Sequence, residues 1–145
     1  LLDGLGRAAE ATTLTEQAIA ADREHPGALL RQALDLQRKG QLDQALAAYQ
    51  ACLQKQPGNP EVLYKLGALY VQLQRNEPAE RAYQNAIATG KAPQGAYANL
   101  GVLFASRGKI PEAVKIWEEG LRREPNGPGA AALRNNLAMA RSMKK

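Results

Sequence analysis

Side chains that could do chemistry are few and scattered in this chain. It carries one cysteine, Cys52, and one histidine, His25, which lies in the DREHPG stretch between two helical patterns. A nucleophile needs a neighbouring base, and a zinc site needs several Cys or His ligands close together. Neither arrangement occurs, and no glycine-rich GxxxxGK[ST] phosphate loop is present. We therefore expect no enzyme activity, no catalytic residue, no metal site and no cofactor.

Carboxylates gather at one place, in residues 118–124. Glu118 and Glu119 lie among Lys115, Arg122 and Arg123 in a stretch with a helical pattern. Opposite charges three or four residues apart pair on the surface of a helix. We interpret this group as a solvated, salt-bridged face and not as a pair of catalytic acids.

The composition favours helices as the elements that position every side chain. Ala, Leu, Gln, Arg and Glu dominate the chain, and all are good helix formers. The 145 residues fit one ordinary domain, and the apolar fraction of 45% is enough for a core. No apolar run approaches the roughly 18 residues that a membrane-spanning helix needs. We expect an all-α protein without a transmembrane segment.

A period of 34 residues organises most of the chain. Leu66 and Gly67 in YKLGALY recur as Leu100 and Gly101 in NLGVLF. Three columns repeat at the same step: Ala45, Ala79 and Ala113; Tyr49, Tyr83 and Trp117; Cys52, Ala86 and Gly120. Each unit is therefore predicted to be two helices of about thirteen residues, joined by a turn.

The expected domain boundaries follow from this period. Three full units are placed at 26–59, 60–93 and 94–127. In the first unit we expect helices near 27–39 and 43–55, with the turn at Gly40. In the second unit, Asn76 is expected to cap the second helix and Pro78 suits its first turn.

Helices are also expected on both flanks of the repeats. Residues 1–25 are interpreted as half of a truncated preceding repeat, and residues 128–145 as a C-terminal capping helix with a basic tail. Aligning Leu137 with Leu100 gives a step of 37, so three residues are inserted before this last helix. Because the chain starts with Leu1 and not Met, we expect it to be part of a longer protein; its composition suggests a bacterial source.

This pattern resembles the tetratricopeptide repeat (TPR) family. The family motif Leu-Gly-x-x-Tyr…Ala-x-x-x-Phe appears as Leu66-Gly67…Tyr70…Ala79…Tyr83. The resemblance implies an α-solenoid, a right-handed superhelix of antiparallel helix pairs. It also implies that Gly67 and Gly101 face the small residues Ala79 and Ala113, while the Tyr/Trp column fills the spaces between units.

The resemblance further implies a concave groove lined by the first helix of each unit. The expected groove residues are Leu30, Arg31, Leu34, Tyr64, Lys65, Ala68, Val71, Ala98, Asn99, Val102 and Asn136. Such an apolar stripe with a polar column suits an amphipathic helix or an extended peptide. We expect Tyr64 and Asn99 to contact a partner and to be dispensable for folding. An alternative is that the chain itself or a second copy fills the groove.

We therefore expect a protein–protein interaction scaffold. The alternatives are a self-assembling oligomer, or the targeting region of a larger enzyme or of a secretion or pilus-type assembly. Chaperone-binding family members use a Lys/Asn carboxylate clamp, but the matching positions here are Leu30 and Leu34. RNA-binding helical repeats have a different period and polar reading positions, so no nucleic acid is expected. The sequence does not decide between cytoplasm and periplasm.

Overall fold

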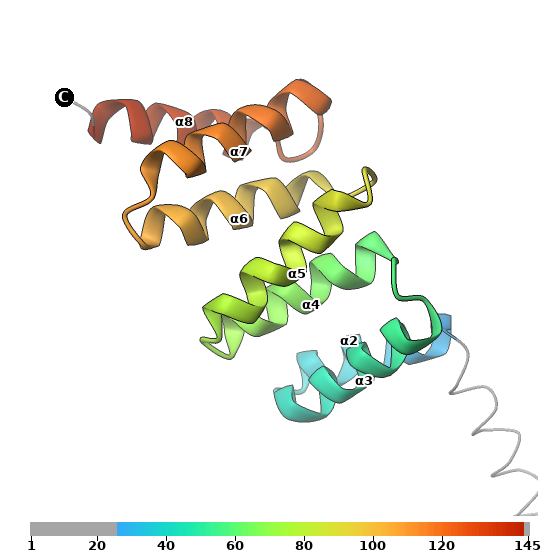
Figure 1. The fold of residues 1–145 in the computed structure, drawn as a ribbon. Coiled ribbons are helices and arrows are strands. Elements are labelled where there is room, and N and C mark those ends of the chain that lie inside the picture. The colour runs from blue at the N-terminus through green and yellow to red at the C-terminus, as the bar shows by residue number, and fades with distance from the viewer. Residues whose placement is uncertain (1–25, 144–145) are drawn as a thin grey trace, which may run out of the picture. The chain divides into compact units, whose positions relative to one another are not determined.

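The structure, a computed structural model, describes residues 26–143, which form seven α-helices and no strand (Figure 1). The helices are α2 (Pro26–Arg38), α3 (Leu42–Lys55), α4 (Pro60–Gln72), α5 (Asn76–Ala88), α6 (Gln94–Ser106), α7 (Ile110–Arg123) and α8 (Ala130–Met143). The predicted all-α fold class is confirmed. The helix predicted within residues 1–25 lies outside the described residues.

The chain divides into two compact parts, Leu1–Pro57 and Gly58–Lys145. In the first part, α2 and α3 pack as a pair through Ala33, Ala45 and Cys52, all of which are buried. The Tyr49 hydroxyl donates a hydrogen bond of 2.7 Å to Oε1 of Gln37, which ties α3 to α2.

The tight turn inside each helix pair uses one residue with a left-handed backbone. These residues are Gly40, Gln74 and Gly108, with φ angles of +79°, +60° and +78°. They are separated by the 34-residue period, so the turn at Gly40 is confirmed and recurs in the later pairs. Glycine adopts this conformation without a steric penalty, but glutamine does not.

The predicted cap at Asn76 is wrong. The N-cap position of α5 is Arg75, which makes no side-chain capping bond, and Asn76 is the first helical residue. The repeat geometry explains the shift: the residue after the left-handed position is the N-cap in every pair, as Gln41 and Lys109 also show. Pro78 does lie in the first turn of α5.

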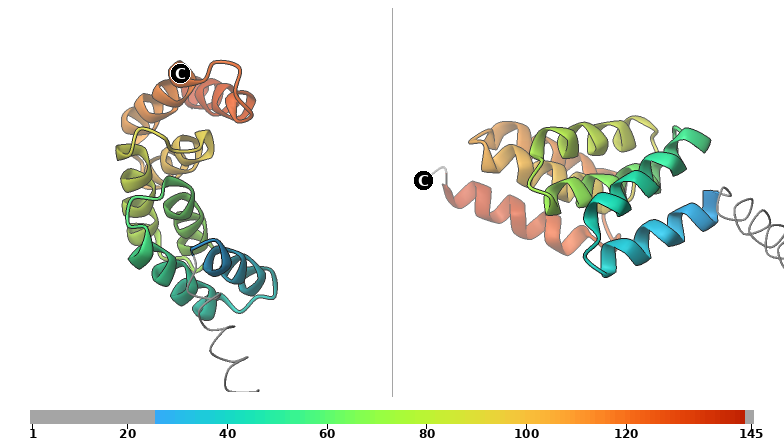
Figure 2. Two further views of the ribbon diagram at one scale, coloured as in Figure 1. Left: turned by 90° about the vertical axis from the view of Figure 1, so that its right-hand side faces the viewer. Right: turned by 90° about the horizontal axis from the view of Figure 1, so that it is seen from below.

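In the second part, two helix pairs and a single helix follow one another. Figure 2 (left) shows α4, α6 and α8 on one side of this part and α5 and α7 on the other. α4 contacts α6, and α6 contacts α8. The first helices of successive units therefore form one layer, and α8 extends that layer.

Two glycines allow aromatic rings to lie directly on a helix backbone. A Cβ atom added to Gly67 would lie 2.7 Å from Cε1 of Tyr83, and one added to Gly101 would lie 2.1 Å from Nε1 of Trp117. The nearest neighbour of each glycine is thus an aromatic ring from the second helix of its own pair. The prediction that Ala79 and Ala113 face these glycines stays a prediction, because the nearest atoms to each glycine belong to the ring.

Ala79 and Ala113 also belong to the clusters that join successive units. Ala79 and Tyr83 pack with Ala96, Leu100 and Leu103 of α6. In the second cluster, Ala113 and Trp117 pack with Tyr97, Leu133, Leu137 and Ala140. The prediction that the Tyr/Trp column fills the spaces between units is therefore confirmed for Tyr83 and Trp117.

Candidate partner-binding groove

The large apolar side chains that stay exposed gather on one layer of the second part. Among the described residues, they are Val71 (39% exposed), Val102 (50%), Met139 (64%) and Met143 (69%). Val71 is on α4, Val102 on α6 and both methionines on α8. Single exposed apolar residues are ordinary, but a set confined to three neighbouring helices makes this layer the candidate contact surface.

A first hollow lies between α4 and α6 and has a volume of about 190 Å³. We call it the α4–α6 hollow. It is lined by Ala68, Val71, Tyr83, Asn99, Val102 and Leu103. Four of the predicted groove residues (Ala68, Val71, Asn99 and Val102) therefore lie together.

A second hollow lies between α6 and α8 and has a volume of about 320 Å³. It is lined by Val102, Ala105, Ser106, Ile110, Trp117, Asn136, Met139, Ala140 and Met143. Val102 lines both hollows, so the α4–α6 hollow and this α6–α8 hollow form one continuous surface. We call it the apolar groove; the layer of helices that carries it is seen in Figure 2.

Asn99 is the polar point in the α4–α6 hollow. Its Nδ2 donates a hydrogen bond of 3.1 Å to the hydroxyl of Tyr83. Burial raises the pKa of Tyr83 to about 12, and the bond from Asn99 opposes part of that rise. The expectation that the scaffold does not need Asn99 stays a prediction, and this bond to the hydroxyl of the buried Tyr83 argues against it.

Tyr64 lies outside the apolar groove and joins two helices. A Cβ atom added to Gly95 would lie 2.4 Å from the hydroxyl oxygen of Tyr64, and the Tyr64 and Tyr83 rings are 6.1 Å apart. Tyr64 and Lys65 instead border a separate hollow at the start of α4 and α6, beside Lys91. The expected dispensability of Tyr64 for folding does not agree with this close packing.

Of the remaining predicted residues of the second part, Asn136 lines the apolar groove and Ala98 does not. Leu30, Arg31 and Leu34 are on α2, in the first compact part, where Arg31 lines a hollow of its own helix. Ala98 on α6 is half-buried, and its carbonyl accepts a hydrogen bond of 3.1 Å from Nε1 of Trp117. Asn136 lines the α6–α8 hollow.

Met139 and Met143 are the exposed groove residues that sequence reasoning missed. The 37-residue step that aligns Leu137 with Leu100 also places Met139 in the position of Val102. The sequence therefore contains a signal for Met139, but three inserted residues hide it because they interrupt the 34-residue period. The structure shows that α8 nevertheless continues the layer of α4 and α6.

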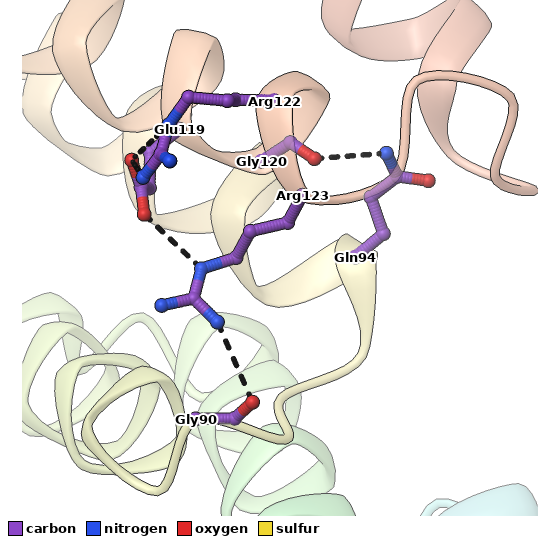
Figure 3. Close-up of polar contacts among 6 residues, drawn as sticks. All are labelled: Gly90, Gln94, Glu119, Gly120, Arg122 and Arg123. Atoms are coloured by element: carbon purple, nitrogen blue, oxygen red, sulfur yellow. Dashed lines mark hydrogen bonds and ion pairs between the residues drawn. The ribbon is translucent and has the colours of Figure 1, made fainter.

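The turn before α8 is fastened by Gln94, the one buried polar side chain among the described residues. Its Nε2 donates hydrogen bonds to the carbonyls of Gly120 (3.2 Å) and Glu124 (2.8 Å), and its Oε1 accepts one from the Gly129 amide (2.8 Å). Figure 3 shows the bond to Gly120. Gln94 thus fixes the end of α7 and the start of α8, and so positions the methionine side of the groove.

An ion-pair group lies beside this turn, as Figure 3 shows. Glu119 accepts hydrogen bonds from both Arg122 and Arg123, which lower the pKa of its carboxyl group. Nη1 of Arg123 also donates to the carbonyl of Gly90, at 3.4 Å. The predicted salt-bridged helix face is therefore confirmed at Glu119, and it additionally links α7 to the α5–α6 turn.

Reactive groups are not assembled in the part of the chain that the structure describes. Cys52 is 1% exposed, and burial raises the pKa of its thiol, which disfavours the nucleophilic thiolate. Residues 26–143 contain no group of three or more His, Cys, Asp or Glu side chains that could hold a metal ion. Over the same residues, no helix is both long and apolar enough to cross a membrane.

Paired antiparallel helices repeating every 34 residues define a helical-repeat protein. Family models described as tetratricopeptide repeat match residues 1–60 and 36–100. The chain therefore belongs to the TPR family. No curated protein sequence matches it.

Solved structures with the same fold share little sequence with this chain. The first TPR domain of Spaghetti (RPAP3), bound to the HSP90 peptide SRMEEVD, is 24% identical over 82% of this chain and 92% of that one, with a TM-score of 0.72. MamA is 22% identical over 89% of this chain and 74% of its own, with a TM-score of 0.76. YrrB, a TPR protein with an unusual peptide-binding site, is 19% identical over 89% and 65%, with a TM-score of 0.73.

Proposed function

We propose that this chain is a protein-interaction scaffold that binds a peptide or an amphipathic helix in the apolar groove. The observation that carries the proposal is the position of Val71, Val102, Met139 and Met143, which border two joined hollows on α4, α6 and α8. A partner that covers these side chains gains the free energy of burying apolar surface.

The chemistry of the groove supports an apolar ligand. Asn99 and Asn136 are uncharged, and Ser106 is the other polar group in the lining of the α6–α8 hollow. Among the structural neighbours, the Spaghetti TPR domain is bound to an HSP90 peptide and YrrB has an unusual peptide-binding site, which supports the same use of this fold here. The HSP90-type clamp is not a model for it, because the matching positions are Leu30 and Leu34.

The test selects peptides from a random library against the whole chain and measures the best of them by calorimetry. Val102→Glu places a charge where the two hollows meet, and we expect it to weaken binding at least about tenfold. Ala138→Glu is the matched control, because Ala138 is exposed on α8 and lines neither hollow. Equal binding by the wild type and Val102→Glu would contradict the proposal.

A further inference from the structure

We infer that a hollow beside the start of α6, which we call the charged hollow, binds a free α-amino acid. It has a volume of about 280 Å³ and lies where the α5–α6 turn meets α6 and the end of α7. Its polar lining residues are Lys91, Gln94, Tyr97, Arg123 and Glu124. Figure 3 shows two of them, Gln94 from α6 and Arg123 from α7. The charged hollow shares no lining residue with either hollow of the apolar groove, so the inference is independent of the proposed function.

Two opposite charges in this hollow have no ion-pair partner among the described residues. The four ion pairs that join residues within 26–143 involve neither Lys91 nor Glu124, although both side chains line the hollow. An ammonium group and a carboxylate that border one hollow without pairing with each other complement a ligand that carries both charges itself.

A third unpaired group is the hydroxyl of Tyr97, which is buried and has no hydrogen-bond partner among the described residues. Tyr97 is 2% exposed and lines the hollow, and the charges of Arg123 and Glu124, two other lining residues, act on its hydroxyl. Burial raises the pKa of Tyr97, so the hydroxyl keeps its proton at neutral pH and can donate it to an acceptor. A carboxylate oxygen of the ligand would supply that acceptor.

The repeat scaffold does not require these polar groups. Thirty-four residues earlier in the chain, Pro57 occupies the position of Lys91. Leu63 likewise occupies the position of Tyr97 and is also buried. A packed unit therefore needs neither a charge nor a hydroxyl at these two positions, and contact with a ligand gives both groups a use.

The ends of two helices orient the charges of the ligand. Gln94 is the first residue of α6 and Arg123 is the last residue of α7, so the N-terminus of α6 and the C-terminus of α7 border the same hollow. A helix N-terminus favours a carboxylate and a helix C-terminus favours an ammonium group. We therefore place the ligand carboxylate beside Lys91 and Tyr97 and the ligand ammonium group beside Glu124.

A free α-amino acid meets these requirements better than the other small charged ligands. It carries its carboxylate and its ammonium group on one carbon atom, so a single small hollow can hold both. A simple anion would leave Glu124 facing a like charge, and the end of a peptide chain carries only one of the two charges.

The test titrates the full chain with each of the common free L-amino acids by calorimetry. We expect at least one of them to bind with a Kd of roughly 1 mM or tighter, as befits a ligand with few non-hydrogen atoms. The amide of that amino acid lacks the carboxylate, and its N-acetyl derivative lacks the ammonium group. We expect each derivative, and sodium acetate at the same ionic strength, to bind at least about tenfold more weakly.

Charge variants of the chain locate the binding. Lys91→Ala and Glu124→Gln are each expected to weaken the best amino acid at least about tenfold. Lys115→Ala and Glu118→Gln are the matched controls, because both positions are exposed on α7 and do not line the charged hollow. We expect both controls to bind like the wild type.

Tyr97→Phe separates contact with the ligand from packing. We expect it to weaken binding about fivefold or more and at the same time to raise the melting temperature of the ligand-free chain, because it removes an unpaired buried hydroxyl. Tyr70→Phe, outside the charged hollow, should leave binding unchanged. A purely structural role of the Tyr97 hydroxyl would leave amino-acid binding unchanged in Tyr97→Phe.

Several results would overturn the inference. Binding of every amino acid more weakly than about 10 mM excludes the site. If acetate or the N-acetyl derivative binds as tightly as the free amino acid, the hollow takes a carboxylate alone and the amino-acid assignment is wrong. Unchanged binding in both Lys91→Ala and Glu124→Gln would place the ligand elsewhere on the chain. Val102→Glu is expected to leave amino-acid binding unchanged, so failure here is distinguishable from failure of the apolar groove.

Discussion

Two buried tyrosine hydroxyls differ in whether they have a hydrogen-bond partner. The Tyr49 hydroxyl donates to Gln37, whereas the buried Tyr97 hydroxyl has no hydrogen-bond partner among the described residues. An unpaired buried hydroxyl costs about 1–3 kcal/mol, and a made bond contributes about 1 kcal/mol. We therefore expect Tyr97→Phe to raise the free energy of unfolding by about 1 kcal/mol and Tyr49→Phe to lower it by a similar amount. Urea titrations measure both, and changes of the same sign would contradict the hydrogen-bond assignment.

Gln74 occupies a backbone conformation that the other two units give to glycine. A φ of +60° costs a residue with a Cβ atom about 1–2 kcal/mol. Glycine at this position would avoid part of that cost. We expect Gln74→Gly to stabilise the protein by about 0.5–1 kcal/mol in thermal unfolding. Gln84→Gly is the matched control, since Gln84 is exposed inside α5 and its replacement should cost about 1 kcal/mol. If both variants are destabilised, the turn assignment is wrong.

Helix pairing depends on the contact between a glycine and an aromatic ring. A Cβ atom at Gly101 would lie 2.1 Å from Nε1 of Trp117, which itself donates to the carbonyl of Ala98. We expect Gly101→Ala to cost about 1–3 kcal/mol, because the indole must move away from α6 and loses that bond. Gly58→Ala is the control, since a Cβ atom there meets nothing within 4 Å. Equal melting temperatures for the two variants would exclude the predicted clash.

The attachment of α8 depends on Gln94. Removing its side chain leaves the Gly120 and Glu124 carbonyls and the Gly129 amide without their partner. We expect Gln94→Ala to cost about 2–3 kcal/mol and to speed amide exchange in α8 more than in α4. Gln50→Ala, at an exposed position of α3, is the control. Uniform acceleration of exchange in α4 and α8 would show that Gln94 acts on the whole fold and not on α8.

At the scale of the whole molecule, buried tyrosine side chains make the free energy of unfolding fall at alkaline pH. The pKa of Tyr83 is about 12 in the folded chain and about 10 when unfolded. Because folding raises this pKa, the protonated form is favoured in the folded state. The stabilisation is fully present below pH 10 and is lost as the pH rises towards 12, at about 1.4 kcal/mol for each pH unit.

Unfolding titrations between pH 9 and 12 measure this loss. Tyr83→Phe should reduce the slope, and Tyr70→Phe, which removes a hydroxyl at the edge of the same cluster, serves as the control. The pKa of Tyr49 and of Tyr97 is also raised by burial, so part of the slope should remain in both variants. If the free energy of unfolding of Tyr83→Phe falls with pH as steeply as that of the wild type, Tyr83 is not a source of the pH dependence.

The repeat scaffold could be predicted from the sequence because each unit is built from local patterns. Helix formers, turn glycines and small or aromatic columns recur every 34 residues, and contacts between neighbouring units repeat with them. The sequence alone therefore predicts that the columns of Ala79, Tyr83 and Trp117 lie in the core.

The tertiary structure decided how individual side chains use that scaffold. The repeat position of Asn99 predicts that it lies in the groove. Its hydrogen bond to the Tyr83 hydroxyl depends on the distance between α5 and α6, which the sequence does not show. Met139 entered the groove because three inserted residues still return α8 to the layer of α4 and α6. Gln94 closes the turn before α8 by hydrogen bonds to residues 30 and 35 positions later in the chain. Such contacts depend on how closely the helices approach one another in space. The 34-residue period predicts the order of the helices along the chain but not the distances between their side chains.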